Sequence, residues 1–119
     1  MTEVTAPRAG LLGLWFALAI GPAAWAVHLM GQAAFVRYAC NDPEWHWALH
    51  GLTVATAAPT IVGLVICWAI VRRTPEPEDA ATPGGRTRFL ALVAGFTAAI
   101  SLGLILLEGS YVLWISDCA

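Results

Sequence analysis

Three ionisable side chains lie inside long apolar stretches of the sequence: His28, His50 and Glu108. Imidazole and carboxylate groups can form a buried hydrogen bond, share a proton or coordinate a transition metal. An ionisable group in an apolar environment is costly, so it usually faces the interior of a helix bundle or a partner. The three residues therefore define a candidate functional site.

The three candidate residues are expected at a similar depth along their helices. A helix rises about 1.5 Å per residue, which places His28 roughly 13 Å from the end of its apolar stretch. The same rise places His50 roughly 9 Å, and Glu108 roughly 12 Å, from the corresponding ends of their stretches. If the three apolar stretches cross a bilayer, all three residues fall in the same outer third of it.

Each candidate residue also has a polar neighbour three or four positions away, and residues at this spacing share one face of a helix. The pairs are Gln32 with His28, His46 with His50, and Tyr111 with Glu108. We interpret the six residues as a polar cluster between helices.

Three roles for the cluster remain open at the level of sequence. It can be a hydrogen-bond network that joins the helices, or a contact surface for a larger membrane complex or a quinone. It can also be a site for haem or copper, with His28, His50 and Glu108 as candidate metal ligands. No ligand spacing typical of a known metal centre supports the third role.

The composition points to lipid as the natural solvent of the chain. Of its 119 residues 59% are hydrophobic and only 12% are charged, with a mean hydropathy of +0.71. Soluble domains carry about 25% charged residues, and a small domain cannot bury so much apolar surface. Neither a basic patch for nucleic acid nor a catalytic motif is present, so we expect neither nucleic-acid binding nor enzymatic activity.

The apolar stretches predict an all-α fold in which three transmembrane helices form one bundle. They cover residues about 10–37, 44–72 and 88–116, and each exceeds the roughly 20 residues that a helix needs to cross a bilayer. A polar linker over 73–87, rich in proline and charge, is expected between the second and third helices. The chain is therefore predicted to be a single integral membrane domain, 1–119, in contact with the lipid bilayer.

The arginines predict the orientation of the bundle. Arg8 precedes the first helix and four more arginines flank the linker, whereas Arg37 alone lies at the opposite end. By the positive-inside rule, the N-terminus and the linker are cytoplasmic and the C-terminus is periplasmic. We expect a multi-pass protein of a bacterial inner (plasma) membrane.

Prolines and small residues are expected to shape the helices. Pro22 and Pro59 lie inside apolar stretches and predict kinks, because proline removes a backbone hydrogen bond. The third stretch contains small residues, which allow close approach between helices in lipid. These residues are Gly95, Ala98, Ala99, Ser101 and Gly103.

The cysteines predict a disulfide at the periplasmic end. Cys40 follows the first helix and Cys118 follows the third, so the predicted topology puts both on the oxidising side of the membrane. The alternative is a thiol pair that handles copper, since soft thiolates favour Cu(I). Cys67, toward the cytoplasmic end of the second helix, is expected to be a buried thiol.

A scattered pattern of residues over nearly the whole chain resembles a known group of proteins. The pattern comprises Gly21, Pro22, Trp25, His28, Tyr38, Cys40, His50 and Cys118. It is similar to small, three-helix bacterial membrane proteins that occur beside haem–copper cytochrome c oxidase genes. In that group a proline usually precedes the last cysteine, whereas this chain has Asp117.

The resemblance implies a respiratory setting, and it does not supply catalytic residues. We expect a small accessory subunit or assembly factor of a respiratory terminal oxidase of the cytochrome c type, within a larger membrane complex. The alternative is a stand-alone haem- or metal-binding membrane protein that uses His28, His50 and Glu108.

Overall fold

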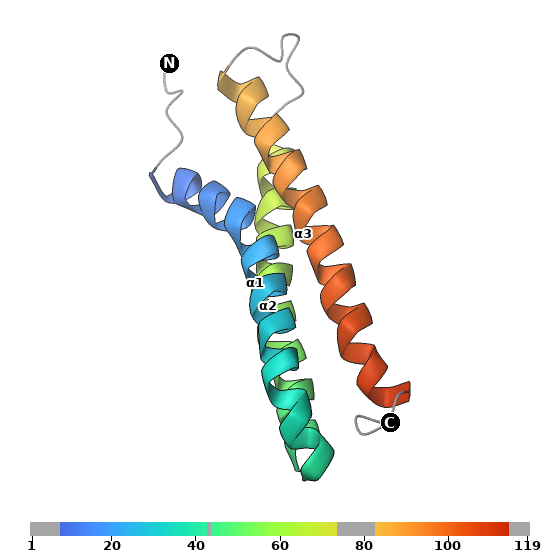
Figure 1. The fold of residues 1–119 in the computed structure, drawn as a ribbon. Coiled ribbons are helices and arrows are strands. Elements are labelled where there is room, and N and C mark those ends of the chain that lie inside the picture. The colour runs from blue at the N-terminus through green and yellow to red at the C-terminus, as the bar shows by residue number, and fades with distance from the viewer. Residues whose placement is uncertain (1–7, 43, 74–82, 115–119) are drawn as a thin grey trace.

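The chain forms three long helices that lie side by side. The structure is a computed structural model that describes residues 8–42, 44–73 and 83–114. The helices are α1 (Arg8–Asn41), α2 (Trp45–Arg73) and α3 (Pro83–Trp114). Each helix contacts the other two, so that the three form an elongated bundle (Figure 1).

The length and composition of the helices suit a membrane. Each helix contains a stretch apolar enough to cross a bilayer, over Leu11–Asn41, Trp45–Arg73 and Gly85–Tyr111. Large apolar side chains such as Met30 and Phe96 lie exposed on the outside of the bundle. Exposed side chains of this kind are stable in lipid and costly in water, so the chain is a multi-pass membrane protein in contact with the bilayer.

The helix ends differ from the predicted ranges, most at the linker. The linker was expected over 73–87, but α3 begins at Pro83 and α2 continues through Arg73. Proline is compatible with the first helical position, because the N–H group it lacks has no partner there. The predicted linker includes the glycines that follow Pro83, yet these glycines continue the helix.

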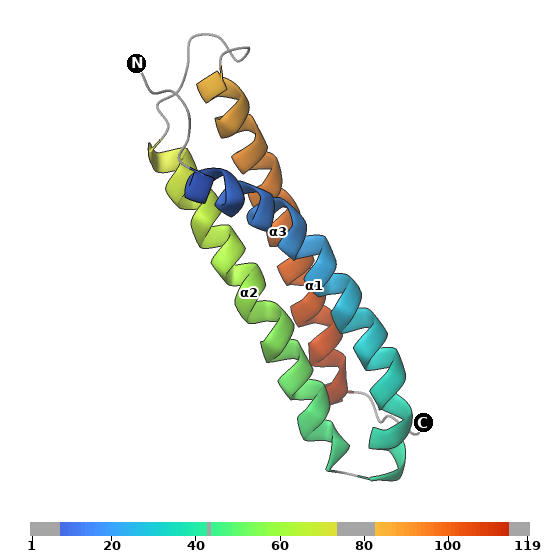
Figure 2. The same cartoon turned by 90° about the vertical axis from the view of Figure 1, so that its left-hand side faces the viewer.

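The connection between α1 and α2 is tight. α1 continues to Asn41, four residues beyond the predicted end. The carboxylate of Asp42 then accepts a hydrogen bond from the backbone N–H of Glu44 at 3.1 Å. This bond satisfies a backbone donor just before α2, as a capping residue does. Consequently α1 and α2 form an antiparallel hairpin (Figure 2).

The two prolines have different effects on their helices. α1 bends in its first half, and Pro22 is the proline inside this helix (Figure 1). α2 contains Pro59 and runs much straighter (Figure 2). The bend of α1 agrees with the loss of one backbone hydrogen bond at proline, and Figure 2 shows no comparable bend in α2.

Small residues line the interface between the helices. The buried apolar positions of the described residues are mostly alanines: Ala17, Ala24, Ala39, Ala57, Ala91, Ala94 and Ala98. α1 and α3 approach each other closely at Gly21, where a Cβ atom would lie 2.9 Å from the Cα atom of Ala98. Close backbone contact of this kind drives helix association where no hydrophobic effect operates.

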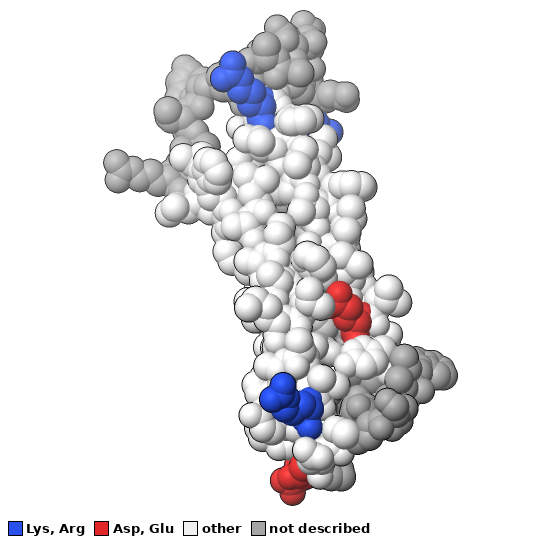
Figure 3. Space-filling view, in the orientation of Figure 1, with Lys and Arg blue, Asp and Glu red and all other residues white. Residues whose placement is uncertain are grey.

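Charged residues lie near the two ends of the bundle, with one exception. Figure 3 shows arginines at one end and mixed charges at the other, with an almost uncharged zone between them. At the arginine-rich end, Arg72 lies over the ring of Trp68 at 4.9 Å, and Arg88 donates to the carbonyl of Val71 at 3.0 Å. The exception is Glu108, which lies within the apolar stretch of α3.

Candidate functional site

His28 and Glu108 meet between α1 and α3. The Nδ1 atom of His28 lies 3.2 Å from Oε2 of Glu108. His28 is fully buried, whereas the side chain of Glu108 is 27% exposed. The pair therefore joins a buried imidazole to a carboxylate at the edge of the bundle.

Trp25 provides a second donor to the same carboxylate. Its indole Nε1–H group donates to Oε1 of Glu108 at 3.0 Å. Trp25 lies three residues before His28, so both side chains leave α1 on the same face. Each oxygen of the Glu108 carboxylate thus has a partner on α1, and these two contacts tie α3 to α1.

α2 contributes Thr53 to the other side of the histidine ring. The Nε2 atom of His28 lies 3.0 Å from Oγ1 of Thr53. The Thr53 hydroxyl itself donates to the carbonyl of Leu49 at 3.1 Å. With its proton directed to Leu49, the Thr53 oxygen is an acceptor for an N–H group on His28.

Gln32 contacts the same ring nitrogen from one helical turn further along α1. Its amide Nε2 atom lies 3.3 Å from Nε2 of His28. An amide nitrogen can only donate, so this contact needs a lone pair on the histidine nitrogen. The oxygen of the same amide, Oε1, is buried and has no hydrogen-bond partner within the described part of the chain.

The surroundings of His28 support two proton arrangements. In the first, neutral His28 donates from Nδ1 to Glu108 and accepts at Nε2 from Gln32. In the second, His28 is doubly protonated, donates to both Glu108 and Thr53, and requires the Gln32 amide to turn by 180° so that its oxygen faces the ring. The Gln32 amide can therefore present either its nitrogen or its oxygen to the ring, according to which ring nitrogens carry a hydrogen.

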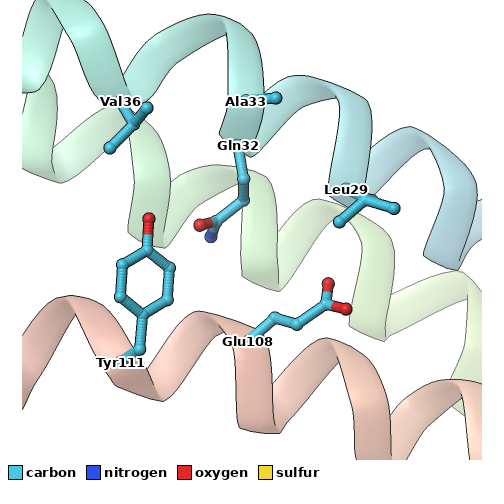
Figure 4. Close-up of a pocket in the computed structure, with 6 residues that line it drawn as sticks. All are labelled: Leu29, Gln32, Ala33, Val36, Glu108 and Tyr111. Carbon is cyan, nitrogen blue, oxygen red and sulfur yellow. The ribbon is translucent and has the colours of Figure 1, made fainter.

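A cavity of about 230 Å³ lies beside this network (Figure 4). Figure 4 shows Gln32 from α1 pointing toward Glu108 and Tyr111 from α3. Leu29, Ala33 and Val36 form the rest of the lining. Tyr111 also packs against the buried pair Ala39 and Leu49 near the end of α1.

The remaining residues of the predicted cluster lie elsewhere on α2. The rings of His50 and Trp47 meet in a T-shaped arrangement, with ring centroids 6.5 Å apart. Across the described residues, no hydrogen bond joins His50 to His28 or Glu108. His46 lies half-buried in the first turn of α2. The structure thus brings together His28, Gln32 and Glu108, with Tyr111 on the adjoining cavity, and leaves the two other histidines outside this network.

A haem or copper site is one of the roles that the sequence leaves open for the cluster. Within the residues that the structure describes, no three His, Cys, Asp or Glu side chains gather closely enough to hold a metal ion. A histidine ligand must offer a nitrogen lone pair to the metal, yet both ring nitrogens of His28 face protein partners. In this arrangement the partners of the His28 ring are Glu108, Thr53 and Gln32, and His50 is not among them.

Sequence reasoning missed Trp25 and Thr53 as members of the site. A signal for Trp25 was present, since its spacing to His28 places both on one helix face. A signal for Thr53 was weaker. It belongs with Thr56 and Thr60 to a row of threonines at helical spacing, each of which donates to a carbonyl of its own helix.

No known protein family matches this chain, and neither a curated protein nor a solved structure is similar to it. The fold and site define its class: a small all-α protein with three helices able to span a membrane, and a hydrogen-bonded His–Glu pair between two of them.

Proposed function

We propose that the protein is a small accessory subunit or assembly factor of a respiratory terminal oxidase of the cytochrome c type. The observation that supports a partner is the position of Glu108. Its carboxylate is partly exposed within the apolar stretch of α3. A carboxylate that faces lipid is costly, and such groups generally face protein or water. A partner subunit that covers this edge of the bundle would remove the cost.

The exposed apolar side chains alone would not require a partner, because lipid covers them equally well. Phe96 and Leu107, for example, are exposed on α3 without any polar group to satisfy. The argument for a complex therefore rests on the edge of the bundle that contains Glu108. The oxidase as the partner, and a bacterial inner membrane as the location, rest on the resemblance of the sequence pattern.

Purification of the full chain from its native membranes in mild detergent tests this function. We expect haem–copper oxidase subunits to co-purify with the wild-type chain, together with the visible absorption bands of their haems. Glu108→Leu should reduce the recovered oxidase several-fold. Glu44→Gln, at an exposed acidic residue just before the span Trp45–Arg73, should leave the recovered oxidase unchanged. Recovery of the wild-type chain alone, from membranes with active oxidase, contradicts the proposal.

The orientation of the bundle is a second part of the proposal. It is supported by the four arginines at the α2–α3 end of the bundle: Arg72, Arg73, Arg86 and Arg88. A reporter enzyme that is active only in the periplasm should work when fused after Ala119. The same reporter should be inactive when inserted between Glu78 and Asp79, because the positive-inside rule places this segment in the cytoplasm. The opposite pattern of activity would reverse the orientation.

We also propose a disulfide between Cys40 and Cys118. Cys40 lies in the last turn of α1, whereas Cys118 lies outside the described residues. A disulfide that closes so long a loop stabilises by up to about 4 kcal/mol, and by less where lipid already confines the unfolded chain. Thiol labelling of protein isolated without reductant should modify Cys67 alone after denaturation. Labelling of all three cysteines would refute the disulfide.

A further inference from the structure

The amide oxygen of Gln32 is a buried acceptor that lacks a donor. Gln32 is only 6% exposed, and its Oε1 atom has no hydrogen-bond partner among the described residues. A buried polar atom left unsatisfied costs about 1–3 kcal/mol. Gln32 lines the cavity together with Glu108 and Tyr111, so a small movement of its amide would bring Oε1 within reach of a donor on a molecule in this cavity.

The cavity has room for a substituted ring. Its volume is about 230 Å³, and an apolar protein cavity of about 150 Å³ is large enough to bind benzene. Its lining is of two kinds. Gln32, Glu108 and Tyr111 are polar, whereas Leu29, Ala33 and Val36 are apolar. Water in the cavity would form hydrogen bonds with the polar residues but make no favourable contact with the apolar ones. An amphipathic ring matches both parts of the lining.

The position of the cavity indicates how a ligand reaches it. All of its lining residues come from α1 and α3, within the stretches that can span a membrane. Leu29 and Glu108 are both partly exposed at its edge, so the cavity communicates with the side of the bundle. A ligand that arrives through lipid is neutral and carries an apolar tail, because a charged ligand would have to leave water first.

We propose that this cavity binds a neutral, hydroxyl-bearing aromatic ring on an apolar tail, which is the chemistry of a quinol. A ring hydroxyl donates to Oε1 of Gln32, while the ring packs against Leu29, Ala33 and Val36. The oxidised quinone carries carbonyl oxygens in place of hydroxyls and offers Gln32 no donor. The reduced form therefore binds more tightly while His28 is neutral and holds the amide nitrogen of Gln32. The ligand and the proposed partner would cover the same edge of the bundle, so we expect the ligand on the chain from which the partner has been removed.

The test measures binding to the purified full chain in detergent micelles by titration calorimetry, with empty micelles as the blank. The probes are a decyl-substituted benzoquinol, its oxidised quinone and its dimethyl ether, which has the same ring without hydroxyl groups. We expect saturable binding of the quinol, and affinities for the quinone and the ether that are weaker by roughly tenfold. Equal affinity for quinol and ether, or no quinol binding above the blank, overturns the proposal.

Three variants distinguish specific binding in the cavity from partition of the quinol into the micelle. Gln32→Leu removes the acceptor, and Ala33→Leu fills the cavity from an exposed position without touching the His28 network. Each should weaken quinol binding by roughly tenfold. Ala34→Leu is the matched control, because Ala34 is exposed on the same helix and does not line the cavity. The proposal is wrong if Ala33→Leu and Ala34→Leu bind the quinol as tightly as the wild type.

Discussion

Replacement of His28 by leucine lowers the free energy of unfolding of the bundle by roughly 3 kcal/mol. The substitution removes the ring that contacts Glu108, Thr53 and Gln32 at the same time. The amide of Gln32 is then buried without its remaining partner, and the carboxylate of Glu108 keeps only the indole N–H of Trp25. Unfolding in mixed micelles with increasing denaturing detergent, followed by circular dichroism, measures the change.

A double-mutant cycle isolates the contribution of the pair. The double variant His28→Leu/Glu108→Leu should be more stable than the sum of the single effects predicts, by at least about 1 kcal/mol. The reason is that removing both partners leaves no unpaired group between them. His50→Leu is the matched control and should change stability by less than about 0.5 kcal/mol, since His50 contacts the ring of Trp47 instead. Strictly additive effects would show that His28 and Glu108 do not interact.

Replacement of Gly21 by valine separates α1 from α3 and destabilises the bundle by about 2 kcal/mol or more. A Cβ atom at this position would lie 2.9 Å from the Cα atom of Ala98 and 3.1 Å from Oγ of Ser101. The neighbour at 2.9 Å is backbone and cannot move aside as a flexible side chain can. The helices must therefore shift apart, which also lengthens the contacts between α1 and Glu108.

Gly103, a glycine on α3, provides the control for this prediction. A Cβ atom built on Gly103 meets nothing within 4 Å, so Gly103→Ala should change the unfolding free energy by less than about 0.5 kcal/mol. Gly21→Ala should already be destabilising in the same detergent titration. If Gly21→Ala and Gly103→Ala behave alike, the close crossing of α1 and α3 is wrong.

The helices could be predicted because long apolar stretches allow few alternatives, but their ends could not. The predicted linker included the glycines after Pro83, because glycine has a low helix propensity. A helix that packs against two others tolerates these glycines. The small residues of α3 indicated close packing without showing which face is used. Ala98 meets Gly21, whereas Ala99 and Gly103 lie exposed on the other side of the same helix.

Depth along a helix could be predicted for the site, and rotation about the helix axis could not. His28 and Gln32 share a face because they lie four residues apart, and Glu108 lies at a matching depth. His50 also has a suitable depth, yet α2 turns Leu49 and Thr53 inward, and His50 follows Leu49 by one position. One position is about 100° of rotation, so His50 points to the flank of the bundle.

The distance between the Glu108 carboxylate and the His28 ring in a bilayer tests the account most directly. Solid-state NMR can measure the dipolar coupling between the ¹³C-labelled side-chain carboxyl of Glu108 and the ¹⁵N-labelled ring of His28. The structure predicts strong coupling to Nδ1, whose distance to Oε2 of Glu108 is 3.2 Å, and weaker coupling to Nε2, which faces Thr53. Undetectable coupling to both ring nitrogens would show that the His–Glu pair does not form in the membrane.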